Sequence, residues 1–211
     1  MSHAAPFLED LGSALPAGSE NANPPGVGLG ALLAEDFRTH GSDPLSPGFW
    51  ALAIHRFGNW RMDVSHKLLR APLSLLYRGA HRGAITLWGI DLPYNAKIGR
   101  RFHIAHHGAV FIGSRAIGDD VTIRHSVTIG LKRKSERLAP IIGNRIEIGP
   151  GACIVGDIQV GDDSVVGANT VLAQNVPPGS VVLGVPARFV APEKEPGFAA
   201  APSETAVPQK S

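Results

Sequence analysis

Aliphatic residues recur every six positions through the second half of the chain, and a glycine often follows the aliphatic residue. A period of six fits neither an α-helix, whose face repeats about every 3.6 residues, nor a flat strand, whose sides alternate. A hexapeptide repeat is the signature of a parallel β-helix, in which aliphatic side chains point inward and glycine fits the tight corners. The repeating positions are Ile98, Ile104 and Val110, then Ile117, Ile123 and Ile129, then Ile142, Ile148, Ile154, Val160, Val166 and Leu172.

The repeat is interrupted twice. A slip of one residue falls between Val110 and Ile117, and a polar, basic and aperiodic segment spans residues 130–141. An insertion into a solenoid leaves as a loop on one face, and such loops are often functional. We therefore expect a loop that protrudes from the prism over residues 130–141.

The first half of the chain has a different pattern. Residues 46–90 carry apolar residues at helical spacing and predict an α-helical segment that packs against another part of the chain. Residues 1–45 are rich in glycine, proline and serine and predict a flexible leader, with a turn or two of helix near residues 29–37. Residues 192–211 predict a disordered tail. The expected fold class is mostly β, with a β-helix over residues 91–191 behind the helical segment.

Composition and charge limit the partners and the cellular compartment that we expect for the chain. Hydrophobic residues make up 44% of the chain and charged residues 18%, which permits a packed core. The balance of 20 Lys and Arg against 18 Asp and Glu argues against a nucleic-acid partner. Cys153 is the single cysteine and cannot form an internal disulfide, which fits the cytoplasm. No signal peptide is read at the N-terminus, and Arg78, His81 and Arg82 make residues 71–89 a poor membrane span, so we expect no membrane partner.

Several short motifs lie between Gly89 and Val190. They are Gly89-Ile90-Asp91, Ala96-Lys97-Ile98-Gly99-Arg100, Ile104-Ala105-His106, Ser126-Val127-Thr128-Ile129-Gly130, Val176-Pro177-Pro178-Gly179-Ser180 and Gly184-Val185-Pro186-Ala187-Arg188. Together they resemble the serine O-acetyltransferase family of hexapeptide-repeat acyltransferases. The resemblance covers about half of the chain and implies the left-handed form of the β-helix.

The resemblance also implies a chemistry. His106 matches the family's general base, which takes the proton of the acceptor hydroxyl as that hydroxyl attacks the thioester of acetyl-CoA. Asp91 matches the aspartate that orients the base and stabilises its charged form. The acceptor would be L-serine, in cysteine biosynthesis, and no acyl-enzyme is needed. Cys153 is interpreted as a structural or surface residue.

A binding site for CoA follows from the same resemblance. In the family, the pantetheine arm lies in a groove between neighbouring prisms of a trimer, so we expect a homotrimer or a dimer of trimers. Gly130 matches a position of close backbone approach, and Ala152 and Ala168 would form small walls. Cations that suit the CoA phosphates are Lys132, Arg133, Lys134 and Arg188. An ordinary solvated loop is the alternative for the three loop cations, and closure of the last coil is the alternative for Arg188.

The chain departs from the family pattern at the acceptor site. Ala105 stands where the family carries an aspartate, and Arg137-Leu138-Ala139-Pro140 stands where the family carries an Arg-His pair before the proline. Arg137 remains a candidate to bind a substrate carboxylate, beside Asp91 and His106. A sugar or another small alcohol therefore stays open as the acceptor. The chain ends in Gln209-Lys210-Ser211 without a large aliphatic residue, so no complex with the sulfhydrylase is predicted.

Four histidines lie between residues 103 and 125, and they keep two other classes open. His106 and His125 are expected to stack one coil apart, while solvent or a subunit interface is the simpler interpretation of His103 and His107. A zinc lyase of the γ-carbonic-anhydrase type is the first alternative, because zinc needs three convergent ligands, although no metal is expected. A catalytically silent scaffold is the second, because of Ala105.

Overall fold

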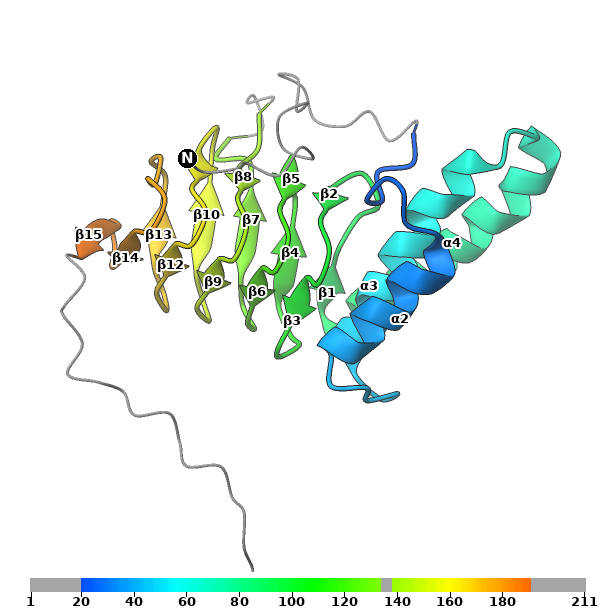
Figure 1. Cartoon of the computed structure of the whole chain (residues 1–211), viewed down its shortest axis with the longest axis horizontal. Helices are drawn as coiled ribbons and strands as arrows, with labels where there is room; N and C mark the ends of the chain where they lie inside the picture. The colour runs from blue at the N-terminus through cyan, green and yellow to red at the C-terminus, as the bar shows by residue number, and fades with distance from the viewer. Residues whose placement is uncertain (1–19, 134–137, 191–211) are drawn as a thin grey trace, which may run out of the picture.

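The computed structural model describes residues 20–133 and 138–190, which form a helical end and a β-prism (Figure 1). The helices are α2 (Leu29–Thr39), α3 (Pro47–Trp60), the short 3₁₀-helix η1 (Arg61–Asp63) and α4 (Lys67–Trp88). In the described part of the chain, no helix combines the length and the apolar character needed to cross a lipid bilayer.

The prism is built from strands of two or three residues. They are β1 (Ile90–Asp91), β2 (Lys97–Ile98), β3 (His103–Ile104), β4 (Val110–Ile112), β5 (Ala116–Ile117), β6 (Thr122–Ile123), β7 (Thr128–Gly130), β8 (Ile141–Ile142), β9 (Glu147–Ile148), β10 (Cys153–Val155), β11 (Gln159–Val160), β12 (Val165–Val166), β13 (Val171–Leu172), β14 (Val181–Leu183) and β15 (Arg188–Val190).

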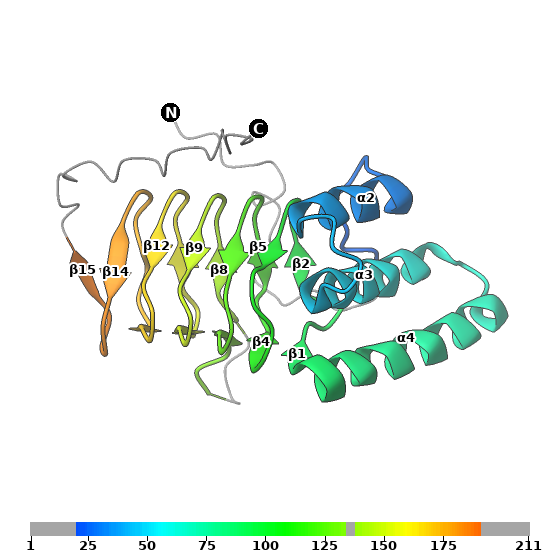
Figure 2. The same ribbon diagram turned by 90° about the horizontal axis from the view of Figure 1, so that it is seen from below.

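Every third strand along the prism joins the same sheet. Within the described residues, sheet A has the order β1-β4-β7-β10-β13, sheet B the order β11-β8-β5-β2, and sheet C the order β15-β14-β12-β9-β6-β3. The pairs are parallel, with Ile98 opposite Ile117 and Ile104 opposite Ile123, until β15 turns back antiparallel on β14. The stacked coils are visible side by side in Figures 1 and 2. The predicted parallel β-helix is thus confirmed.

The repeating aliphatic residues fill the interior of the prism. All twelve positions of the predicted repeat have side chains that are at most 3% exposed. The one-residue slip falls at the corner between β4 and β5, and the interruption from 130 to 141 falls between β7 and β8. Both irregularities therefore lie between strands, and the core register continues on either side of them, with Ile112 opposite Ile129 and Ile117 opposite Ile142.

A ladder of polar side chains holds one corner of the coils. Asp119 Oδ1 accepts the Arg100 N–H (2.7 Å), Asn144 Oδ1 accepts the Asp119 N–H (2.9 Å), and Asp162 Oδ1 accepts the Asn144 N–H (2.9 Å). The glycine before each of these corners leaves room for the ladder, since a Cβ on Gly118 would lie 2.5 Å from Asn144 Oδ1.

The helices cover the open edge of the first coil, which would otherwise expose unpaired backbone groups. Arg56 on α3 donates to the carbonyl oxygens of Ile98 (2.7 Å) and Gly99 (2.6 Å). The Ile104 N–H donates to His40 Nε2 at 3.2 Å. Side chains from the helical end thus do for the first coil what a preceding coil would do.

Part of the segment expected as a leader belongs to the helical end. Leu32 and Asp36 on α2 are fully buried, and Glu35 accepts hydrogen bonds from Arg100 Nε (3.0 Å) and Nη2 (2.9 Å). The helix expected near residues 29–37 is present as α2, it runs on to Thr39, and long-range contacts with the prism hold it in place. Residues 1–19 and the predicted tail over 192–211 lie outside the described residues.

Candidate active site

Two histidines stack at the corner between sheet C and sheet A. Ile104 lies opposite Ile123, and His106 and His125 each come two residues later. Their ring centroids are 6.0 Å apart, with 56° between the ring planes. Both side chains are exposed on the outside of the prism. The predicted stacking of His106 and His125 is therefore confirmed, and it places side by side two groups of the type that takes up and returns protons.

The other two histidines of this region lie in different surroundings. His107 is exposed, as the solvated interpretation expects. His103 instead packs edge-on against His40 of the helical end, with ring centroids 5.0 Å apart. Burial lowers the pKa of His103, and His40 lowers it further. His103 is therefore only partly exposed, because His40, the residue that caps the C-terminus of α2, packs against it.

Asp91 is positioned by the end of α4. Gly89 ends that helix in the left-handed conformation (φ 65°) that glycine adopts without strain, and β1 follows at once. Asp91 lies opposite Phe111 of β4. Its Oδ1 is 3.2 Å from His81 Nε2, a contact without the alignment of a hydrogen bond. Within the described residues, the histidine that pairs with Asp91 is therefore His81 and not His106.

His81 lies beside Asp91 in the candidate active site, and no sequence motif predicts it. In sequence it only interrupts an apolar stretch, yet its ring stacks on the buried Tyr77, with centroids 5.5 Å apart and 13° between the planes. The Tyr77 hydroxyl in turn accepts the Tyr94 N–H at 3.1 Å. This stack fixes the imidazole over the start of β1 and so over Asp91.

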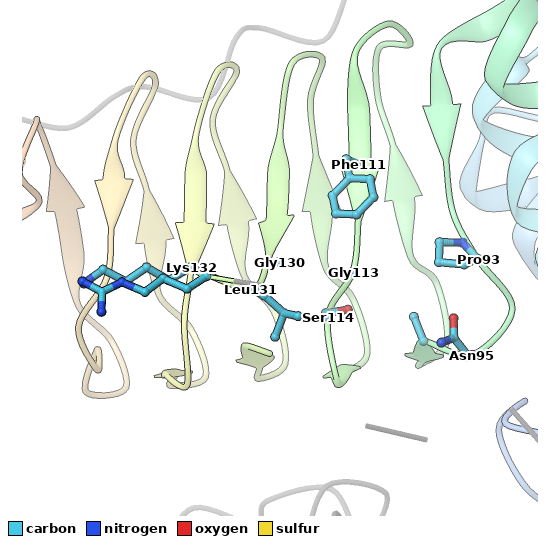
Figure 3. A pocket seen from close by; sticks show the side chains of 10 residues that line it. Pro93, Asn95, Phe111, Gly113, Ser114, Gly130, Leu131 and Lys132 are labelled. Carbon is cyan, nitrogen blue, oxygen red and sulfur yellow. The ribbon is translucent and has the colours of Figure 1, made fainter. Parts of the chain in front are cut away.

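A hollow of about 500 Å³ lies at the opposite edge of sheet A, where β4 and β7 end (Figure 3). Its lining brings together three residues expected near the donor, Gly130, Lys132 and Arg133. Phe111, Pro93 and Leu131 supply apolar walls, and the Lys132 side chain extends along the prism away from Pro93 (Figure 3). The full lining is Pro93, Asn95, Ala96, Phe111, Gly113, Ser114, Gly130, Leu131, Lys132 and Arg133.

Ser114 adds a polar atom to this hollow. Its side chain is 2% exposed, and its Oγ has no hydrogen-bond partner among the described residues. A buried hydroxyl without a partner is costly unless a ligand or water pairs with it. Ser114 occupies the one-residue slip of the hexapeptide repeat, and that slip was the only sign of it in the sequence.

Three other residues predicted for the CoA site do not line the hollow. Ala152 is fully buried in the prism core, so its methyl group cannot form the wall expected of it, and Ala168 is exposed after β12. Arg188 lies on β15 opposite Leu183, and its side chain is exposed. Lys134 and Arg137 lie outside the residues that the structure describes.

The histidines of this region do not gather in the way that metal ligands do. Across residues 20–133 and 138–190, no three or more His, Cys, Asp or Glu side chains form a group that could hold a metal ion. Cys153 is partly buried on β10.

Hexapeptide coils that stack into a three-sheeted parallel prism are the architecture of hexapeptide-repeat transferases. A family model described as "Bacterial transferase hexapeptide (six repeats)" matches residues 139–174. Curated relatives include the serine acetyltransferase of Mycobacterium tuberculosis, 40% identical over 68% of this chain and 61% of the relative. That of Helicobacter pylori strain J99 is 37% identical over 71% of this chain and 85% of the relative.

A third relative carries a different name. The putative colanic acid biosynthesis acetyltransferase WcaB of Escherichia coli K12 is 40% identical over 74% of this chain and 97% of the relative. Among solved structures, the soybean serine acetyltransferase apoenzyme has a TM-score of 0.61 and 31% identity, covering 77% of this chain and 69% of that one. A serine acetyltransferase in complex with CoA has a TM-score of 0.61 and 27% identity, over the same shares.

The chain belongs to the serine O-acetyltransferase family of hexapeptide-repeat acyltransferases. The resemblance drawn from the motifs is confirmed, and so is the left-handed β-helix that it implied. The chain spans 61% of the length of the Mycobacterium tuberculosis relative.

Proposed function

We propose that this chain is a serine O-acetyltransferase, which transfers the acetyl group of acetyl-CoA to the hydroxyl of L-serine. The observation that carries the proposal is the exposed imidazole of His106, stacked beside His125 on the outside of the prism. The serine acetyltransferases that match this chain at 37% to 40% identity support the same activity.

The hollow where β4 and β7 end is the proposed binding site for the pantetheine arm of acetyl-CoA. Gly113 and Gly130 contribute no side chain to its lining, and the Ser114 hydroxyl can donate to a carbonyl oxygen of the arm or accept from its amide N–H. Lys132 and Arg133 at its mouth suit phosphate oxygens, and Lys134 and Arg188 are proposed to extend that charge. The solved relative in complex with CoA supports acetyl-CoA as the donor substrate.

The proposed reaction is a direct transfer. The acceptor hydroxyl oxygen forms a bond to the thioester carbonyl carbon while His106 takes the hydroxyl proton. The C–S bond then breaks, the CoA sulfur leaves with the electron pair, and His106 returns the proton to that sulfur. A general base contributes roughly 10²- to 10⁴-fold, so holding the thioester and hydroxyl together must supply most of the rest.

Asp91 is proposed to orient His106 and to stabilise its charged form, as in the family. In the single chain its carboxylate faces His81. Arg137 is proposed to bind the carboxylate of the acceptor.

The proposed site is shared between subunits of a trimer. His106 lies at the corner before β4, while the hollow lies where β4 ends, so the width of sheet A separates the base from the proposed donor site. A neighbouring prism that brings its own hollow to the His106 corner would join the two halves. Closed cyclic symmetry is the usual form of such an assembly. The proposal includes a cytoplasmic setting and a place in cysteine biosynthesis.

A second candidate is acetyl transfer to a sugar or another small alcohol. It is favoured by the match to the putative colanic acid biosynthesis acetyltransferase over 97% of that relative's length. Ala105 and Leu138 stand where serine enzymes of the family carry acceptor-binding groups. The donor, the base and the proton path are the same in both candidates.

The test is thiol release from acetyl-CoA with serine, homoserine and a panel of sugars as acceptors. His106→Ala should lower the rate about 10²- to 10⁴-fold. The matched control is His107→Ala, which removes the neighbouring exposed imidazole and should leave the rate within about twofold. Thiol release with a sugar, and not with serine or homoserine, would establish the second candidate. A failure to release thiol with every acceptor would overturn both.

A further inference from the structure

Helix α4 exposes an apolar face that the described chain does not cover. Its buried side chains are Tyr77 and Ala84, on the face toward the rest of the molecule. On the other side, five leucines are between 62% and 88% exposed: Leu68, Leu69, Leu75, Leu76 and Leu87. The helix starts far from the prism and runs back toward β1 along the outer side of the helical end (Figure 2). Exposed apolar faces of this kind mark interaction sites.

The same helix is strongly basic. It carries Lys67, Arg70, Arg78 and Arg82, and no acidic residue lies between Asp63 and Asp91. Within the described residues, none of these four cations forms an ion pair with an Asp or Glu. Residues 47–90 contain six Lys and Arg against one Asp, while the whole chain is nearly balanced at +2. The excess positive charge is therefore concentrated in residues 47–90, which include α3 and α4.

The cations and the leucines occupy adjoining parts of the exposed surface. Lys67, Arg78 and Arg82 are separated by eleven and four residues, which brings them to one side of the helix. Leu68 and Leu75 are seven residues apart and fall next to this row. An apolar strip bordered by cations is the pattern of a helix that lies in the interface of a membrane, with the leucines in the acyl region and the cations at the headgroups.

We infer that α4 docks the protein on an anionic phospholipid surface. A second copy of α4 would fit this face less well, because it would bring eight cations together with no acidic side chain on either helix. Phosphatidylglycerol and similar lipids offer both an apolar layer and the negative charge that the helix lacks. The proposed contact runs along the membrane surface, and it differs from the expectation of no membrane partner, which rested on the N-terminal sequence and on the lack of a spanning segment.

The experiment is co-sedimentation of the full chain with vesicles. One set contains equal parts of phosphatidylglycerol and phosphatidylcholine, and the other contains phosphatidylcholine alone. We expect binding to the anionic vesicles, weaker binding to the neutral ones, and release as sodium chloride is raised. Arg78→Gln with Arg82→Gln should lower the partition coefficient about tenfold or more.

The leucines have a matched control. Leu68→Gln with Leu75→Gln should lower binding about tenfold or more. Leu45→Gln changes a leucine that is 83% exposed in the loop before α3 and should leave binding unchanged. All of these side chains are exposed, so thermal unfolding should be nearly the same in each variant.

Three results would overturn the inference. The first is wild-type protein that fails to prefer anionic vesicles. The second is undiminished binding by the Leu68→Gln, Leu75→Gln variant. The third is a lower particle mass of that variant by light scattering, compared with wild type and Leu45→Gln, since this would show that another copy of the chain covers the leucines.

Discussion

Arg56 and Asp36 form a wholly buried ion pair, with 2.9 Å between Arg56 Nε and Asp36 Oδ2. Burial raises the pKa of Asp36, and Arg56 opposes that rise. The two other ends of the same guanidinium donate to the carbonyl oxygens of Ile98 and Gly99. One side chain thus joins α2, α3 and the first coil of the prism.

Replacing Arg56 is expected to uncouple these three elements. Arg56→Met should lower the free energy of unfolding by about 3–5 kcal/mol, because it leaves a buried carboxylate without its partner and two carbonyl groups without donors. Urea unfolding measures the change. Arg145→Met is the control, since it breaks an exposed ion pair with Asp163 and should cost far less. Equal losses in the two variants would contradict this role of Arg56.

Glycines at the prism corners and on α4 should respond oppositely to alanine. A Cβ on Gly118 would lie 2.5 Å from Asn144 Oδ1 and 2.6 Å from the Gly143 carbonyl oxygen, so Gly118→Ala should destabilise by about 1–3 kcal/mol. Gly83 has open space around its Cβ position, and Gly83→Ala should stabilise the helix by about 0.5–1 kcal/mol. Thermal unfolding compares the two directly. A gain in stability from Gly118→Ala would show that the polar ladder is not tightly packed.

These two predictions mark how far the sequence alone reaches. The prism was predictable because each hexapeptide carries its own inward aliphatic residue and its own corner. The period of six can therefore be recognised from residues that are close in sequence. The helical cap was only half predictable, because α2 is held by contacts such as Glu35 with Arg100, which lie far apart in sequence. A short Gly-rich and Pro-rich segment looks flexible until those partners are known.

The candidate site divides in the same way. His106 and His125 were predictable because the repeat sets their register. His81 and Ser114 were not predictable. His81 contacts Asp91 across the C-terminal end of α4, and the burial of Ser114 after β4 does not follow from the spacing of the repeat. The hollow itself arises from the ends of β4 and β7 together with residues after β1.

The free energy of unfolding should decrease as the pH is lowered from about 6.5 to about 5, because the protein contains buried histidines. His55 is wholly enclosed, with Nδ1 3.1 Å from the Pro93 carbonyl oxygen and Nε2 3.2 Å from Asn59 Nδ2. Burial, together with a smaller contribution from the charge of Arg56, lowers the pKa of His55 to about 3. Its unfolded value is near 6.5. The unfolded chain therefore binds the proton first, and the stability present above about pH 6.5 is lost as pH falls toward about 3.

The measurement is urea unfolding at about pH 7 and pH 5. One such histidine contributes a slope of up to about 1.4 kcal/mol per pH unit, and His40, whose pKa is also lowered by burial, adds in the same direction. His55→Gln should reduce the slope, whatever its effect at pH 7. A slope that is unchanged in this variant would assign the pH dependence to other groups.

The contact between His81 and Asp91 should matter for catalysis under the proposed function. His81 is a positioning residue, because its ring is stacked on Tyr77 and its Nε2 lies 3.2 Å from Asp91 Oδ1. His81→Gln removes the ring that holds this carboxylate at the start of β1. We expect kcat to fall about tenfold to a hundredfold, less than in His106→Ala, since the base itself remains.

The readouts separate positioning from folding. The loss should fall on kcat more than on the KM for acetyl-CoA, and the acid limb of the pH–rate profile should move, because the carboxylate that is proposed to orient His106 has lost its partner. His66→Gln, at the exposed N-cap of α4, is the matched histidine control and should keep the wild-type profile. Full kcat in His81→Gln would mean that Asp91 is held by another group. A fall in activity that merely follows thermal unfolding would give the Tyr77–His81 stack a structural role alone.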